Sequence, residues 1–214
     1  VSILRQLRDG DPNRPGDFPW SLALVGLRDV RDYKADPAAS AAQSASPFNI
    51  KDASLTLRNF TADEVRELYA QHTADTGQVF TLEAARRAFE LSGGHPWLVN
   101  ALAKEAVEEL VEDPASPVTE AEIDAAKEIL IRRQDTHLDS LAERLREPRV
   151  RRIIEPILAG EALPPVPEDD LRYVQDLGLV RAQGGAGLVI ANPIYREVIP
   201  RSLASVALAS LPHI

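Results

Sequence analysis

The sequence predicts a mainly α-helical fold with a small β component. Three observations support this prediction. Apolar residues recur at helical spacing, behind capping residues, from residue 61 to residue 133. A second series of helical patterns begins at residue 138. Close to the C-terminus, two short apolar runs separated by glycines are typical of a β-hairpin.

The first two predicted helices have clear start and stop signals. Thr61 and Glu64 form a capping box, in which each side chain binds a free backbone N–H of the first turn. Gly77 is expected to end that helix. A second helix is expected to begin after Thr81 and to end at Gly93-Gly94.

Two further helices complete a predicted four-helix unit over residues 61–133. Pro96 is expected in the first turn of the third helix, where a backbone N–H is not needed. Thr119 and Glu122 repeat the capping box before the fourth helix. The buried stripe expected on the third helix consists of Val99, Leu102, Ala103, Ala106 and Leu110.

The region from residue 135 to residue 214 has the element order of a winged-helix domain: helix, helix, β-hairpin, helix. In its first long helix, Pro156 is expected to kink or shorten the helix. The later predicted elements are a helix over 168–177, strands over 179–181 and 188–191, and a last helix from Pro193 through Val198.

Residues 1–55 contain one short apolar run, Ser21–Leu27, between turn signals. Such a run is typical of a strand buried on both faces of a parallel sheet. Residues 35–47 are rich in Ala and Ser and are expected to form a loop. The chain has no methionine and begins within an apparent helix, so we expect it to be part of a longer protein.

Composition excludes several classes of function. The hydrophobic share of 44% and charged share of 27% fit an ordinary globular protein, and no apolar run approaches the roughly 20 residues that span a bilayer. The net charge of -9 disfavours broad binding to nucleic acid or anionic membranes. The sequence has no cysteine, which excludes thiolate metal sites and cysteine nucleophiles. We expect a cytoplasmic protein that binds no membrane and has no metal site.

The sequence contains no phosphate-binding loop of the Walker A type. That motif needs a lysine directly after a glycine, and none of the four lysines follows a glycine. No apolar strand ends in the Asp-Glu pair of a Walker B motif. Alone, this chain is therefore expected to bind no nucleotide cofactor and to hydrolyse no ATP, and we assign no catalytic residue.

Four segments nevertheless resemble AAA-like prokaryotic ATPases of the AAA+/STAND and archaeal groups. One of them, between Phe48 and Gln78, is similar to the entry to their lid. Ser21–Tyr33 resembles their sensor-1 strand, and Gly93–Ala103 is similar to their Gly-x-Pro lid signature. Residues 150–201 are similar to the winged helix that follows the lid. The resemblance implies that residues 1–55 are the C-terminal remnant of a P-loop nucleotide-binding domain, 56–134 a helical lid, and 135–214 a winged-helix domain.

The resemblance also implies a nucleotide site completed by the full-length protein, which would hold ATP or ADP with Mg through its P-loop. Arg28 would sense the γ-phosphate, and Pro96 would contact adenine or ribose, beside Gly94 and His95. Each residue also has a simpler interpretation. Arg28 can pair with a nearby aspartate, Pro96 can serve only as a first-turn proline, and His95 can be structural.

Two other functions stay open: a non-enzymatic adaptor whose winged helix binds a protein partner or a second copy, and a DNA-binding regulator. Charge disfavours DNA, because residues 149–214 contain seven arginines and seven acidic residues. The expected recognition helix also begins with Glu168-Asp169-Asp170, which phosphates would repel.

Overall fold

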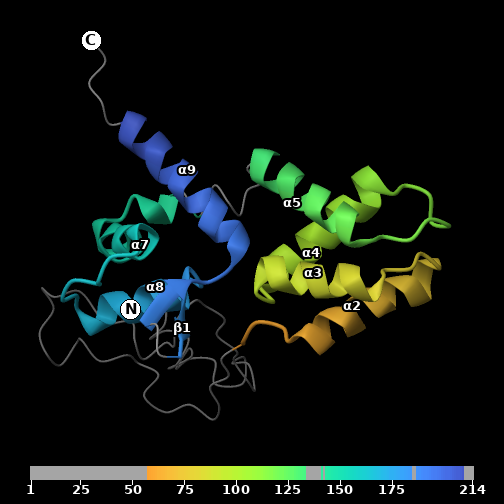
Figure 1. The fold of residues 1–214 in the computed structure, drawn as a ribbon, viewed down its shortest axis with the longest axis horizontal. Coiled ribbons are helices and arrows are strands. Elements are labelled where there is room, and N and C mark those ends of the chain that lie inside the picture. The colour runs from red at the N-terminus through yellow and green to blue at the C-terminus, as the bar shows by residue number, and fades with distance from the viewer. Residues whose placement is uncertain (1–56, 134–140, 142, 185–186, 210–214) are drawn as a thin grey trace, which may run out of the picture. The chain divides into compact units, whose positions relative to one another are not determined.

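The computed structural model describes residues 57–133, 141, 143–184 and 187–209. The chain divides into two units, Val1–Leu57 and Arg58–Ile214, and the described residues belong almost entirely to the second. The fold is mainly helical with one small two-stranded sheet, as the sequence predicts (Figure 1). Arg28 and the strand and loop expected within residues 1–55 lie outside the described residues. The predicted domain boundaries stay predictions.

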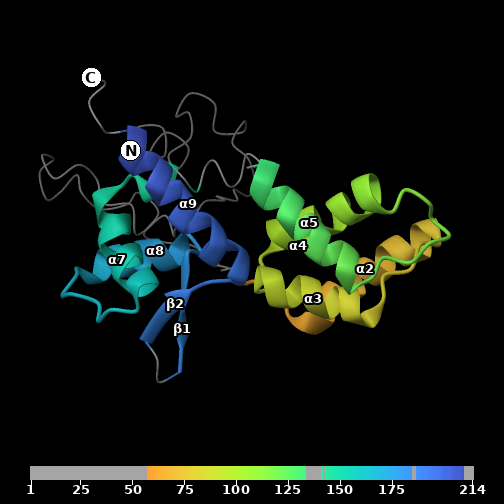
Figure 2. The same ribbon diagram turned by 45° about the horizontal axis from the view of Figure 1, so that its top comes forward.

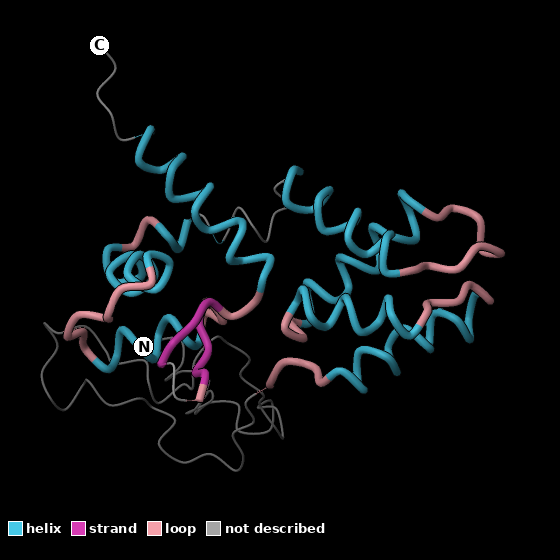
Figure 3. Tube along the Cα trace, in the orientation of Figure 1, coloured by secondary structure: helices cyan, strands magenta, loops and turns pink. Residues whose placement is uncertain are grey.

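Four helices form the first part of the described chain, called here the four-helix segment (Figure 3). They are α2 (Ala62–Thr76), α3 (Leu82–Ser92), α4 (Pro96–Glu105) and α5 (Glu120–Arg133). Helix α3 packs against the other three, and α4 also packs against α5. The buried side chains of this segment are almost all aliphatic, with alanines on α3 that let its neighbours approach closely.

The start and end of α2 confirm the predicted caps. The Glu64 N–H donates to the Thr61 hydroxyl, and the Thr61 N–H donates to the Glu64 carboxylate at 2.8 Å. Arg58 also donates to that carboxylate, at 2.7 and 2.8 Å. The hydrogen bond from Arg58, followed by the one from the Thr61 N–H, lowers the pKa of Glu64 to about 2. Gly77 ends the helix at φ 83°.

The caps predicted for α3 are both present, and the capping box predicted for α5 is present in part. Thr81 accepts a hydrogen bond from the Ala84 N–H, and Gly93 ends α3 at φ 59°, both as predicted. In the first turn of α5, the Glu122 carboxylate accepts from the Thr119 N–H at 2.8 Å. The Thr119 hydroxyl donates to the same carboxylate, so the glutamate completes its half of the predicted box.

A π-helix, η2 (Ala106–Leu110), continues α4 and corrects one prediction. Leu110 was expected in the buried stripe, but its side chain is 37% exposed. The Val111 N–H donates to the Ala106 carbonyl, five residues back, so the turn is wider than an α-helical turn. This extra residue in the turn rotates Leu110 away from the core. Val99, Leu102 and Ala106 are buried as predicted, whereas Ala103 is only half-buried.

Residues 78–81 and 111–118 connect the helices and are tied together by hydrogen bonds. The side chain of Gln78 is buried and donates to the Val111 carbonyl at 2.9 Å. Phe80 and Val118 form a parallel β-bridge. These contacts fix the extended segment between α2 and α3.

The second part of the described chain, called here the hairpin segment, has the predicted order of elements (Figure 2). The antiparallel strands pair Val180 with Ile190 and Gln183 with Gly187, and α7, α8 and α9 contact the hairpin. The elements are α7 (Pro148–Ala159), α8 (Glu168–Asp176), β1 (Val180–Gln183), β2 (Gly187–Ile190) and α9 (Pro193–Ala209).

Prolines interrupt these helices less than the sequence suggests. Helix α7 continues three residues beyond Pro156, to Ala159. Helix α9 was expected to end at Val198 but passes through Pro200 and ends at Ala209. Burial explains the extension of α9, because Ile199 and Ser202 lie on its buried face on both sides of the proline. Within the described residues, no helix is long and apolar enough to cross a bilayer.

Candidate functional site

The turn between α3 and α4, residues 93–96, holds three of the four predicted nucleotide-binding residues. Gly93 and Gly94 both have a positive φ, at 59° and 74°. Gly94 has no space for a side chain, because a Cβ there would overlap the backbone carbonyl oxygen of Phe60. Glycine is therefore required at position 94 both by conformation and by close approach.

Hydrogen bonds fasten this turn to the chain that enters α2. The Phe60 N–H donates to the Gly94 carbonyl at 2.8 Å, and the Asn59 side chain donates to the Gly93 carbonyl at 3.1 Å. From inside α3, the buried Ser92 hydroxyl accepts from the Gly94 N–H at 3.1 Å and donates to a helix carbonyl. The path of the turn is thus fixed on both sides.

Pro96 begins α4 at its first position, as predicted. His95 is the N-cap residue, but its side chain does not cap the helix. Its backbone takes part in the turn, since the His95 N–H donates to the Ser92 carbonyl at 3.2 Å. His95, Pro96 and Trp97 are half-buried. This first turn combines the partial positive charge of a helix N-terminus with a rigid proline ring.

The hairpin segment reaches the same turn through the start of α9. A Cβ at Gly93 would lie 3.1 Å from the Ala191 carbonyl oxygen and 3.3 Å from Cβ of Asn192. The ring of His95 meets that of Tyr195 edge-on, with centroids 5.9 Å apart. Asn192 caps α9 by accepting from the Tyr195 N–H at 2.9 Å, and burial raises the pKa of the Tyr195 phenol.

A second contact joins the two segments farther along α9. The Lys127 ammonium on α5 donates to the Glu197 carboxylate at 2.8 Å and also pairs with Glu128 at 2.9 Å. The lysine side chain is only 13% exposed, and its bond to Glu197 raises the pKa of Lys127. Sequence reasoning missed this pair because 70 residues separate its members.

The structure thus brings Gly94, His95 and Pro96 into one turn, while Arg28 lies outside the described residues. Whether these residues contact a nucleotide stays a prediction. Within the described ranges, no three His, Asp or Glu side chains are grouped so as to hold a metal ion.

The charge of the hairpin segment bears on DNA binding. Helix α8 carries Glu168, Asp169 and Asp170 in its first turn. Several arginines of this segment are engaged with carboxylates. Arg149 pairs with a glutamate at 2.8 Å, and its guanidinium stacks 3.4 Å from the centroid of the Tyr173 ring. Within the described part of this segment, the first turn of α8 is therefore negatively charged, and Arg149 is already paired.

No family model matches the chain, and no curated protein matches it. Among solved structures, the chain is similar to the Walker-type ATPase PABY2304 of Pyrococcus abyssi, with 18% sequence identity and a TM-score of 0.42. The match covers 66% of this chain and 42% of that one, so the chain spans about two fifths of the length of that structure.

Proposed function

We propose that this chain is the C-terminal part of an AAA+/STAND-type ATPase, in which the four-helix segment is a nucleotide-sensing lid. ATP or ADP would lie between a P-loop elsewhere in the full-length protein and the first turn of α4. Pro96 would contact adenine or ribose, and Arg28 would approach the γ-phosphate. Support for the proposal comes from the sequence resemblance around residues 93–103 and from the geometry of the turn that begins there.

One observation carries the coupling part of the proposal: the turn at Gly93–Pro96 contacts both the chain entering α2 and the start of α9. Packed interfaces transmit small displacements because they deform little. A nucleotide that shifts the first turn of α4 would therefore shift α9 with it. We propose that the hairpin segment reports nucleotide state by this movement, as in other two-state rigid-body transitions.

The test uses two proteins: the 214-residue chain and the polypeptide extended upstream as its gene encodes. The chain alone is expected to show no ATP turnover above background. In the extended protein, Pro96→Ala should weaken ADP binding by about tenfold or more in calorimetry. Its cost in stability should be small, on the order of 1 kcal/mol, because the helix can form without the proline.

Pro148→Ala is the matched control, because Pro148 also occupies the first position of a helix, α7. It should cost similar stability and leave ADP affinity unchanged. Amide hydrogen exchange at the start of α9 provides a second readout, since ADP should slow it in the wild type. The proposal fails if Pro96→Ala binds ADP as the wild type does, and the turn is then only a helix start.

A further inference from the structure

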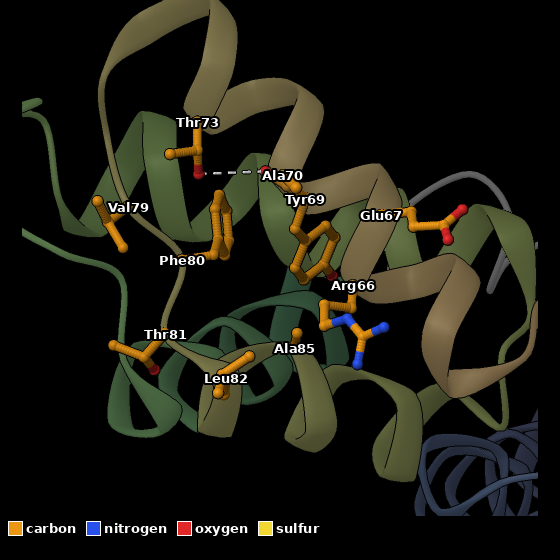
Figure 4. A pocket seen from close by; sticks show the side chains of 10 residues that line it. All are labelled: Arg66, Glu67, Tyr69, Ala70, Thr73, Val79, Phe80, Thr81, Leu82 and Ala85. Carbon is orange, nitrogen blue, oxygen red and sulfur yellow. Dashed lines mark hydrogen bonds between the residues drawn. The ribbon is translucent and has the colours of Figure 1, made fainter.

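A hollow of about 350 Å³ lies on the four-helix segment, between α2, α3 and the segment that joins them (Figure 4). Its floor includes the rings of Tyr69 and Phe80, whose centroids are 4.5 Å apart. The side chains of Val79 and Leu82 stand at its edge and are 49% and 69% exposed. Leucine is not needed at the first position of α3, where Thr81 already provides the cap.

The segment beside this hollow forms an isolated β-bridge whose outer edge is unpaired. The Thr81 N–H donates to the Val118 carbonyl at 3.0 Å, and the Val118 N–H donates to the Val79 carbonyl at 2.9 Å. In this parallel pairing, the N–H and C=O groups of Phe80 face away from Val118. Within the part of the chain that the structure describes, neither group has a hydrogen-bond partner. An edge of this kind is a template for another strand.

One cation lines the hollow. Figure 4 shows the Arg66 guanidinium extending toward α3, while the Glu67 carboxylate points away from the two rings. Arg66 is half-exposed and pairs with Asp63 at 3.1 Å. A surface ion pair of this kind is weak, so Arg66 can exchange Asp63 for a carboxylate brought by a partner.

We propose that this hollow is a docking site for an extended peptide segment of a partner protein. The peptide would add a strand along Val79–Thr81, exchanging main-chain hydrogen bonds with Phe80. One apolar side chain would enter the hollow, and a nearby acidic side chain would meet Arg66. In this mode of recognition, backbone hydrogen bonds supply affinity and the pocket for alternate side chains supplies specificity.

The size of the site favours a short peptide over a second copy of the chain. Ten residues line the hollow, whereas a stable protein–protein interface uses roughly 20–30 residues on each side. Only one residue, Phe80, offers unpaired backbone groups, and the apolar hollow is shallow. Both features fit a weak, reversible interaction. This inference does not depend on nucleotide binding and goes beyond the function proposed above.

The test begins with phage-displayed random heptapeptides selected on the immobilised 214-residue chain. We expect enriched sequences to share an apolar residue and an acidic residue at a constant spacing. Synthetic versions of the two most enriched peptides should bind the chain in fluorescence anisotropy with micromolar dissociation constants. Leu82→Glu should weaken binding at least tenfold. Leu110→Glu is the matched control, because Leu110 is another exposed leucine, on η2, and its change should leave binding unaltered.

Strand addition makes a sharper prediction about the peptide backbone. N-methylation of the one peptide amide that faces Phe80 should abolish binding, while N-methylation of the next amide along should have little effect. Arg66→Gln should remove the preference for the acidic residue and keep the response to N-methylation. Leu82→Glu should unfold within a few degrees of the wild type, because Leu82 is 69% exposed, and thermal unfolding of Leu110→Glu, where the leucine is 37% exposed, checks that the control variant is folded in the binding assay.

Four results would overturn the proposal. The first is the absence of enriched peptides. The second is an equal loss of binding in Leu82→Glu and Leu110→Glu. The third is binding that is insensitive to N-methylation at every position. The fourth is a concentration-dependent dimer in sedimentation that Leu82→Glu abolishes, which would assign the surface to a second copy of the chain.

Discussion

Replacing Gly94 by alanine tests the close contact that fixes the turn between α3 and α4. A left-handed conformation costs a non-glycine residue roughly 1–2 kcal/mol. The new Cβ would also overlap the Phe60 carbonyl oxygen, which is backbone and cannot rotate away. Displacing Phe60 would weaken its 2.8 Å hydrogen bond to Gly94, worth about 1 kcal/mol, and overpacking adds roughly 1 kcal/mol or more. We expect a total loss of about 3–5 kcal/mol.

Gly77→Ala is the matched control for this measurement. Gly77 also has a positive φ, 83°, but a Cβ there would meet nothing within 4 Å. Only the conformational cost of roughly 1–2 kcal/mol should remain. Urea unfolding followed by far-UV circular dichroism measures both variants, and hydrogen exchange of the Phe60 amide reports the local bond. If the two variants differ by less than about 0.5 kcal/mol, the close contact is not what requires glycine at position 94.

Three more predictions concern charged groups. A double-mutant cycle with Lys127→Ala and Glu197→Ala, measured by urea unfolding, should give a coupling energy between the two side chains of about 0.5–1 kcal/mol. Because the folded pKa of Lys127 is raised above its ordinary 10.5, that coupling should be complete from neutral pH up to pH 10.5 and decline as the pH rises through the folded value. The folded pKa of Glu64 is lowered from 4.5 to about 2, so the capping box should stabilise α2 fully above pH 4.5 and progressively less as the pH falls toward 2. Amide hydrogen exchange in the first turn of α2 should follow this pH dependence. In Glu64→Gln the pH dependence should disappear. Arg133→Ala should destabilise the chain by about 2–3 kcal/mol, because it removes the guanidinium that lies 2.7 Å from the buried Glu105 carboxylate. The double variant Arg133→Ala/Glu105→Leu should be destabilised less, because it has no buried carboxylate at that position. Urea unfolding of the two variants provides the comparison.

Local chemistry explains what the sequence could predict. The starts of α2 and α4 depend on Thr61 and Pro96, and the end of α2 depends on Gly77. Each of these residues acts on backbone groups within one helical turn, so a few neighbouring residues of the sequence are enough to predict where the helix begins or ends. The order of helices and strands in the hairpin segment was predictable for the same reason.

Contacts between distant residues could not be predicted in this way. The sequence places His95 in the turn before one helix and Tyr195 within another, but it does not indicate that their rings meet. The bond between Phe60 and Gly94 likewise depends on how α2, α3 and α4 pack, and not on the residues next to either partner. Leu110 shows a related limit, because helical spacing assumes a constant number of residues per turn.

The π-helix that follows α4 also bears on how this helix would tolerate insertions and deletions. A wide turn accommodates one more residue than an α-helical turn over the same stretch of helix. Loss of one residue within Ala106–Leu110 would let an ordinary α-helix continue to the point where Val111 binds Gln78. In most helices, a single deletion turns every later side chain by about 100°. Here, the wide turn can absorb the change, so the length of the chain can vary at this place without moving the helices on either side.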